Sequence, residues 1–367
     1  MKKNFSHYFL YLIIACGSVV ITSCKKDKQE PSEPVITNYA TLGLYQRSVV
    51  DNGTTYKRIF MPVKIGTTTT IYAGIFDTGS TGLTIDAKDI LPADMITPNG
   101  LIVPGDSVNV AGGITVTNKA SIIAFGGGAS GETREYGNLA YAVVTLGDAN
   151  TTTTTTTRIP IFIYYKVVDV TTGTNFPAHS ADVFGVGPGV SYASDKIASP
   201  LSYFKLPTGV TSGFKLALLN TPFTSTPTAV PSLLTIGLTP TDLNSSGFIM
   251  HNLDFYSVGG YSPNIRAKFT YNNKTVNNAF LLFDTGDPAI TYLADPTAAG
   301  VTTLPAGTPV SLTTNNGFSY QYTTATNSNV TQVVNTSDPR SIFSLDFFVK
   351  NEYLLDYQNH RIGLKNN

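Results

Sequence analysis

Cysteine, histidine and charged residues are scarce in this chain of 367 residues. The two cysteines, Cys16 and Cys24, both lie near its start, so the remainder holds no disulfide framework and no thiol nucleophile. The four histidines are scattered and show no zinc-ligand spacing such as HExxH. GxSxG and the phosphate-loop pattern GxxxxGK(S/T) are also absent. We therefore expect no metal site and no cofactor.

The charge balance excludes further classes of protein. Charged residues make up 13% of the chain, well below the usual quarter, which argues against a disordered acidic chain or a long solvated helix. Lysine plus arginine and aspartate plus glutamate number 24 each, so no net field attracts nucleic acid. We expect no nucleic-acid partner, and we expect a monomer.

The residues that are abundant favour β-structure. The chain contains 32 glycines and 21 prolines, together with many Thr, Val, Ile, Tyr and Phe residues. Short apolar or alternating runs bounded by turn residues, such as 58–66, 70–76 and 140–147, are typical of strands in sandwiches and barrels. Only a few segments, including 199–206 and 338–350, could be helical. The sequence predicts an all-β protein.

The first 24 residues have the features of a signal peptide. Lys2 and Lys3 precede an apolar run over 8–21 that is short for a transmembrane span. The run ends in Ile-Thr-Ser-Cys at 21–24, which resembles the lipobox of bacterial lipoproteins. That resemblance implies cleavage before Cys24 and lipidation of this cysteine. The alternative is an ordinary signal peptide with a cysteine there by chance.

Residues 25–38, KKDKQEPSEPVITN, are charged and contain proline, as in a flexible tether. Stable membrane attachment takes more than one acyl chain, and bacterial lipoproteins carry three. The resemblance therefore implies a lipid-anchored protein of the bacterial cell envelope. Because Lys25 follows Cys24, the aspartate that commonly retains such proteins at the inner membrane is lacking, and we expect the outer membrane.

One segment of the body occurs twice. The first copy, GIFDTGSTGLTI, spans 74–85, and the second, LLFDTGDPAITY, spans 281–292. In each, an apolar strand runs into Phe-Asp-Thr-Gly and the chain then returns to apolar residues. The two aspartates, Asp77 and Asp284, lie 207 positions apart, so each belongs to its own half of the body.

Paired carboxylates supply a chemical reason for this repeat. Two carboxyl groups held close together share one proton and titrate as a pair. The ionised member can accept a proton from water while the protonated member donates to a carbonyl oxygen. Glycine permits a tight turn, and threonine can tie one loop to its partner through hydrogen bonds. The residues that would orient the pair are Thr78, Gly79, Ser80, Thr285, Gly286 and Asp287.

On these two DTG loops the chain resembles a pepsin-type aspartic protease. The resemblance implies a bilobal fold with a cleft between two β-barrel-like lobes, the first over 39–212 and the second over 213–367. It implies Asp77 and Asp284 as the catalytic dyad and a polypeptide as substrate. The alternative is two coincidental Asp-Thr-Gly turns in an unrelated β protein.

Three further stretches fit the family in order. Residues 122–131 resemble the flap hairpin that closes over the substrate, with Phe125, Gly126 and Gly127 as its substrate-binding residues; a plain glycine-rich hairpin is the alternative. Residues 182–187 resemble the segment that braces the first catalytic loop. Residues 342–364 resemble the closing helix, strand and hairpin.

The sequence departs from the family at several positions. Ser80 follows the first DTG as the family prefers, whereas Asp287 follows the second, where Ser or Thr is expected. Asp287 would either raise the pKa values of the dyad or stay protonated and donate the hydrogen bond of the missing hydroxyl. Ser344 stands where the first lobe has Gly185, and Phe125 replaces the flap tyrosine. Two functions follow: an active aspartic endopeptidase, or an inactive relative that binds a peptide or glycan in the cleft.

Overall fold

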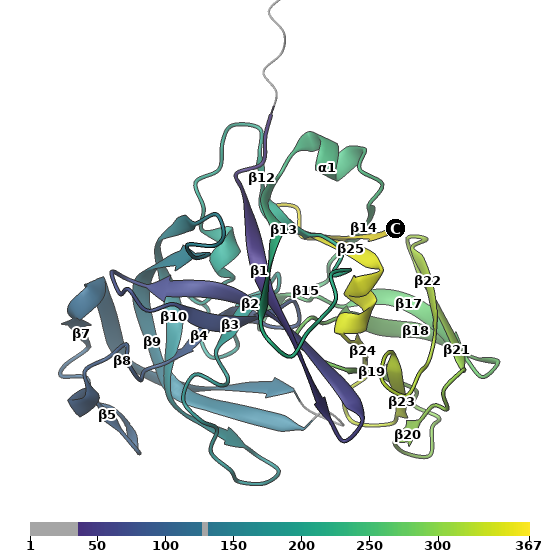
Figure 1. Ribbon diagram of the computed structural model, residues 1–367, viewed down its shortest axis with the longest axis horizontal. Coiled ribbons are helices and arrows are strands. Elements are labelled where there is room, and N and C mark those ends of the chain that lie inside the picture. The colour runs from purple at the N-terminus through teal and green to yellow at the C-terminus, as the bar shows by residue number, and fades with distance from the viewer. Residues whose placement is uncertain (1–35, 127–130) are drawn as a thin grey trace, which may run out of the picture. The chain divides into compact units, whose positions relative to one another are not determined.

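The computed structural model describes residues 36–126 and 131–367 (Figure 1). Cys24, the predicted signal peptide, most of the predicted tether and Gly127 lie outside these residues. Residues 36–367 form one compact unit. No helix within the described part of the chain is long and apolar enough to cross a membrane.

A 14-stranded sheet organises the unit, in the order β14-β26-β25-β12-β13-β1-β2-β3-β11-β4-β10-β9-β8-β7. Its strands are β1 (Ala40–Asp51), β2 (Thr54–Ile65), β3 (Tyr72–Asp77), β4 (Thr81–Asp86), β7 (Ser107–Val110), β8 (Ile114–Gly126), β9 (Glu132–Leu146), β10 (Thr154–Asp169), β11 (Val183–Val186), β12 (Thr211–Leu216), β13 (Thr228–Leu238), β14 (Ile249–Asn252), β25 (Asn351–Asp356) and β26 (Arg361–Asn366).

A second sheet of eight strands comes entirely from the second half of the chain, in the order β20-β23-β19-β24-β18-β17-β21-β22. Its strands are β17 (Ile265–Tyr271), β18 (Lys274–Phe283), β19 (Ile290–Ala294), β20 (Thr302–Thr303), β21 (Pro309–Thr314), β22 (Ser319–Thr323), β23 (Val330–Val334) and β24 (Arg340–Phe343). Two small hairpins complete the described strands: β5 (Ile96–Thr97) with β6 (Gly100–Leu101), and β15 (Phe255–Tyr256) with β16 (Gly260–Tyr261).

Strand β1 joins the two halves of the chain. Its first residues pair with β13, with Ala40 opposite Ile236, and its later residues pair with β2, with Tyr45 opposite Phe60. One strand therefore links the strands of the first half to β12, β13, β25 and β26, as can be followed in Figure 1. The two halves share a continuous backbone ladder rather than a flexible linker.

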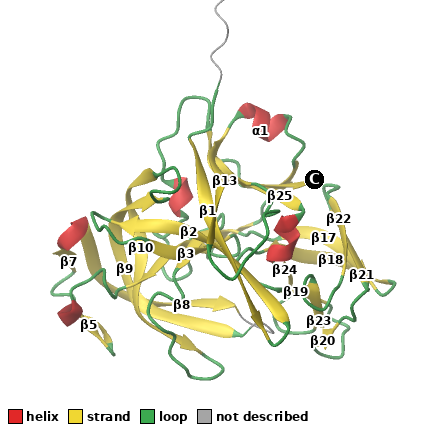
Figure 2. Ribbon diagram, viewed as in Figure 1, coloured by secondary structure: helices red, strands yellow, loops and turns green. Residues whose placement is uncertain are grey.

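Among the described residues, helix is confined to short segments (Figure 2). These are α1 (Pro240–Asn244) and the 3₁₀ turns η1 (Ala93–Met95), η2 (Ala111–Gly113), η4 (Pro200–Ser202) and η5 (Leu345–Val349). Residues 199–206 and 338–350 were expected to be helical, but only η4 and η5 within them are. Residues 340–343 form β24 because they pair in parallel with β18, and a strand position overrides local helix preference. The prediction of an all-β fold is confirmed.

One large apolar core runs through both halves. Buried strand residues alternate with exposed ones, as in β17, so each sheet turns one face inward. Among its largest fully buried side chains are Phe76 and Phe214, whose rings meet edge to face with centroids 5.9 Å apart. Phe283 packs on Phe347 with centroids 4.2 Å apart. This packing fixes the ends of β3 and β18, where the two DTG segments begin.

Candidate active site

The two DTG segments begin at the ends of structurally equivalent strands. β3 ends at Asp77 and runs parallel to β11, with Gly185 opposite Asp77. β18 ends just before Asp284 and runs parallel to β24, and the Asp284 N–H donates to the Phe343 carbonyl at 2.8 Å. A buried neighbouring strand therefore braces each aspartate, as the resemblance implied for residues 182–187.

Thr78 and Thr285 lock the two loops together. The Thr78 hydroxyl donates to the Phe283 carbonyl at 2.7 Å and accepts from the Thr285 N–H at 3.0 Å. The Thr285 hydroxyl donates to the Phe76 carbonyl at 2.7 Å and accepts from the Thr78 N–H at 3.0 Å. Both threonines are buried, so these four bonds are shielded from water. The structure brings together the two motifs predicted to pair.

The two carboxyl groups lie against one another because both loops carry glycine at the point of contact. A Cβ atom on Gly79 would sit 2.4 Å from Oδ2 of Asp284, and one on Gly286 would sit 2.6 Å from Cγ of Asp77. A hydrogen bond joins the Asp77 and Asp284 side chains. Glycine is thus required at both positions for close approach rather than for a special backbone angle.

The two aspartates differ in the donors that face them. Asp77 accepts hydrogen bonds from the N–H groups of Gly79 (2.7 Å) and Ser80 (3.2 Å) and from the Ser80 hydroxyl (2.5 Å). Asp284 accepts from the Gly286 N–H at 2.7 Å. Burial, the charge of Asp77 and the hydrogen bond with Asp77 raise the pKa of Asp284 well above its usual range. Asp284 is therefore the side that favours a shared proton.

Asp287 lies beside the dyad and bonds within its own turn. Its Oδ1 accepts from the N–H groups of Ala289 and Ile290, both at 3.3 Å. Burial raises the pKa of Asp287 to about 6, and the charge of Asp287 in turn raises the pKa of Asp284. Of the two roles considered for Asp287, these contacts favour the electrostatic one.

Arg58 is a residue of this site that the sequence did not single out. It lies on β2, and its Nη1 donates to the Gly286 carbonyl, 228 positions away. Its charge also interacts with Asp287, Asp77 and Asp284. No motif surrounds Arg58 in the sequence, so only the pairing of the two halves could have identified it.

The substitution of glycine by serine in the second lobe is accommodated. A Cβ on Gly185 would meet the backbone of Thr81 at 2.7 Å, whereas Ser344 is fully buried without such a clash. The Ser344 hydroxyl lies 3.4 Å from the Thr291 hydroxyl, which also accepts from the Ser344 N–H at 3.3 Å. Ser344 thus has a partner in β19 and leaves the second loop in place.

The predicted flap lies at the end of the β8–β9 hairpin. Phe125 pairs with Thr133 and is partly exposed, and Gly126, with φ of 74°, is the last described residue before the tip. The assignment of Phe125 and Gly126 to substrate binding stays a prediction, as does that of Gly127.

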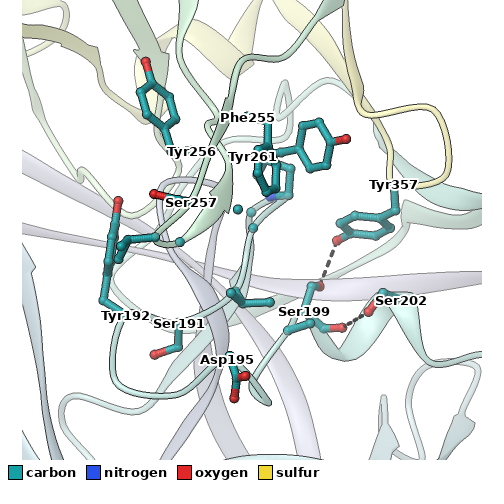
Figure 3. A pocket seen from close by; sticks show the side chains of 18 residues that line it. Ser191, Tyr192, Asp195, Ser199, Ser202, Phe255, Tyr256, Ser257, Tyr261 and Tyr357 are labelled. Carbon is teal, nitrogen blue, oxygen red and sulfur yellow. Dashed lines mark hydrogen bonds between the residues drawn. The ribbon is translucent and has the colours of Figure 1, made fainter.

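An aromatic hollow of about 570 Å³ lies next to the first catalytic loop. Figure 3 shows the side chains that line it. Its lining comes from part of the segment 187–202, from the β15–β16 hairpin and from Tyr357. The Gly187 N–H donates to the Ser80 carbonyl at 2.7 Å. Tyr192 and Phe255 on its walls are 84% and 64% exposed. Asp195 is the one charged side chain in the lining, so the hollow suits apolar or aromatic groups.

Within residues 36–126 and 131–367, no group of three or more His, Cys, Asp or Glu side chains is arranged to hold a metal ion.

Comparison with known proteins agrees with this geometry. No family model matches the chain, and no curated protein sequence matches it. Solved structures do: the basic 7S globulin from soybean at 13% identity and TM-score 0.54, over 89% of this chain and 96% of that chain. The aspartic proteinase from Irpex lacteus matches at 15% identity and TM-score 0.52, over 89% and 97%.

The chain has the pepsin-like fold. At these identities the similarity establishes the fold alone, and one of the two pepsin-like proteins is described as a globulin rather than a proteinase. What the chain does must therefore be argued from its own residues.

Proposed function

We propose that this protein is an aspartic endopeptidase that hydrolyses peptide bonds with the Asp77–Asp284 dyad. The observation that carries the proposal is the asymmetric pair: two carboxyl groups lie against one another, three donors face Asp77, and one backbone N–H faces Asp284. Two carboxyl groups held against one another would be a cost to a protein that only binds.

The residues divide the chemistry between them. Asp77 accepts a proton from a water molecule, and the water oxygen adds to the carbonyl carbon of the substrate. Asp284 donates its proton to the carbonyl oxygen, which gives a tetrahedral diol without any covalent link to the protein. Asp77 then donates its new proton to the nitrogen while Asp284 takes a proton from a diol hydroxyl, so the C–N bond breaks and both carboxyl groups return to their starting states. Ser80 holds Asp77 in position, and the Thr78–Thr285 lock keeps the two carboxyl groups in contact.

The aromatic hollow supports a polypeptide as the substrate. It adjoins the first catalytic loop through the Gly187–Ser80 bond and offers exposed rings and few charges. Such a surface can pack apolar side chains on one side of the bond to be cut.

We also propose that the protein acts at a bacterial membrane, anchored through lipid on Cys24 and joined to it by residues 25–38. The support is the lipobox-like sequence at 21–24 and the compact unit that begins at Ile36. The outer membrane is the proposed location.

Binding of a statine-type transition-state mimic tests the enzyme against the alternative. Its tetrahedral hydroxyl imitates the diol, so the full chain should bind it far more tightly than the matching unmodified peptide. Asp77→Asn should remove this preference. Equal binding of the mimic and the peptide, unchanged by Asp77→Asn, would contradict the proposal and favour a peptide- or glycan-binding relative.

A further inference from the structure

The β1–β2 hairpin of the first lobe docks on the second catalytic loop. The Lys57 N–H donates to the Pro288 carbonyl at 2.9 Å, and the Lys57 ammonium forms an ion pair with Asp346. The next residue, Arg58, donates from Nη1 to the Gly286 carbonyl. Two consecutive residues of the first lobe thus hold the segment that contains Asp287.

The hydrogen bond from Arg58 to the Gly286 carbonyl lies close to the dyad. Gly286 lies so close to Asp77 that a Cβ on it would meet the carboxyl carbon at 2.6 Å. A bond to the Gly286 carbonyl therefore fixes the peptide unit on which the Asp77 carboxyl group rests. The same peptide unit leads into Asp287, whose carbonyl accepts from the Leu345 N–H at 3.0 Å.

Charge is unusually concentrated around this peptide unit. Asp77, Asp284 and Asp287 gather here, and the charge of Arg58 interacts with all three. Other titratable groups that interact with these carboxylates are Tyr292 with Asp287, and Arg340 and Tyr353 with Asp284; Tyr56 in turn interacts with Tyr292. Arg340 already donates to both carboxylate oxygens of Asp338, from Nε to Oδ1 at 2.9 Å and from Nη2 to Oδ2 at 2.7 Å. Arg58 is thus the cation left to balance the third carboxylate among the described residues around the dyad.

We propose that Arg58 is a positioning residue that balances the charge of Asp287 and holds the Gly286–Asp287 peptide, so that the dyad keeps one proton despite a third carboxylate. Arg58 and Asp287 act as a matched pair across the two lobes. The pair explains how the Asp77–Asp284 dyad can share one proton although Asp287 stands where Ser or Thr is expected. Its catalytic consequence rests on the proposed endopeptidase function.

A double-mutant cycle on the full chain tests the pairing. Loss of the positive charge in Arg58→Met should shift the pH profile of kcat/KM to higher pH by about one unit, because the remaining carboxylates then hold protons more strongly. Loss of the negative charge in Asp287→Asn should shift it to lower pH. The double variant should return close to the parent profile. The proposal would be overturned if the pH profile of the double variant were displaced further from the parent profile than that of either single variant. Such a result is expected if the two residues act only on structure, because the effects of the two substitutions then add.

Arg58→Lys distinguishes the role of the positive charge of Arg58 from the role of its hydrogen bond to Gly286. It keeps the positive charge but not the planar fork that reaches Gly286, so the profile should stay near the parent position while kcat falls. This variant also carries the test if Arg58→Met does not fold. A profile displaced as far as in Arg58→Met would contradict the charge-balancing role.

Titration of the Asp284 carboxyl group needs no catalytic turnover, so it tests the Arg58–Asp287 pairing independently of the proposed endopeptidase function. In protein with ¹³C-labelled aspartate carboxyl groups, the signal missing in Asp284→Asn identifies Asp284. Its titration midpoint should rise in Arg58→Met, fall in Asp287→Asn and return in the double variant. This pattern supports the pairing even if the chain cleaves nothing. A midpoint that does not move in Arg58→Met overturns it even if the chain is a protease.

Discussion

Thr78 and Thr285 exchange hydrogen bonds through both their hydroxyl and N–H groups, although they stand 207 positions apart. Each hydroxyl also donates to the strand that leads into the other's loop, at Phe283 or Phe76. The relationship is reciprocal, so neither catalytic loop is positioned by its own lobe alone. The distance between the carboxyl groups therefore depends on the contact between the two halves.

Removal of either hydroxyl should weaken both the fold and the activity. Thr78→Ala or Thr285→Ala leaves buried donors without an acceptor, and each should lower the free energy of unfolding by about 1–3 kcal/mol. The double variant should lose less than the sum, because the two hydroxyls lie 3.4 Å apart in one hydrogen-bond network. Urea unfolding measures the free energy of unfolding of the single and double variants, and a cleavage assay measures their activity. Thr→Ser at the same positions is the control, and equal loss in the serine variants would contradict the hydrogen-bond explanation.

Replacement of Asp287 by threonine should keep activity and move its optimum to lower pH. The change removes a negative charge that raises the pKa of Asp284 and restores a hydroxyl at the position after DTG. The measurement is kcat/KM as a function of pH beside the parent chain. An optimum that stays in place or moves to higher pH would show that the charge of Asp287 does not act on the dyad.

Glu135 on β9 predicts a second pH effect, on stability rather than on catalysis. Its side chain is fully buried, its Oε1 accepts from the Thr84 hydroxyl at 3.1 Å, and its Oε2 has no partner. Burial raises the pKa of Glu135 well above its usual range, and the charges of Asp182 and Asp86 add to this. The folded state therefore favours the protonated carboxyl group.

Because the pKa of Glu135 is higher in the folded than in the unfolded chain, stability is lost as pH rises above the unfolded value of about 4.5. Glu135→Gln removes this loss. The variant should gain stability over the parent by up to about 1.4 kcal/mol per pH unit above that point, with little difference at pH 4. Thermal unfolding at several pH values measures it. A constant difference at every pH would show that Glu135 does not titrate in this range.

Membrane attachment should depend on Cys24. Cys24→Ala removes the thiol that a lipid would modify, so the protein should leave the membrane fraction of the producing bacterium and lose incorporation of labelled palmitate. The stability and activity of the body should not change, since residues 36–367 form a compact unit. Retention in the membrane fraction by Cys24→Ala would contradict the lipid anchor. Cys16→Ala is the matched control and should stay attached.

Much of the architecture could be predicted because its signals are local. Alternating apolar runs and turn residues indicated strands, and the repeated Phe-Asp-Thr-Gly segment indicated two equivalent loops, which the structure brings into contact. The segment at 340–343 was misjudged because its strand identity depends on parallel pairing with β18. A partner 60 positions away leaves no mark on local helix preference.

Arg58 could not be found from the sequence for a related reason. Its importance depends on the docking of one hairpin on a loop from the other half, where Lys57 contacts Pro288 and Arg58 contacts Gly286. An arginine in an alternating strand otherwise indicates only an outward-facing position. Asp287 was recognised as a departure, but its compensating charge required the three-dimensional arrangement.

Cleavage of an unfolded protein by the full chain tests the central claim most directly. The measurement scans about pH 3 to 7, the range in which carboxyl groups can share a proton, and maps the cut bonds by mass spectrometry. Asp77→Asn and Asp284→Asn are matched controls that keep size and shape while removing one carboxyl group. We predict cleavage by the parent chain that disappears in both variants and is blocked by a statine-type mimic. Cleavage that persists in either variant, or its absence from the parent at every pH, would contradict the account.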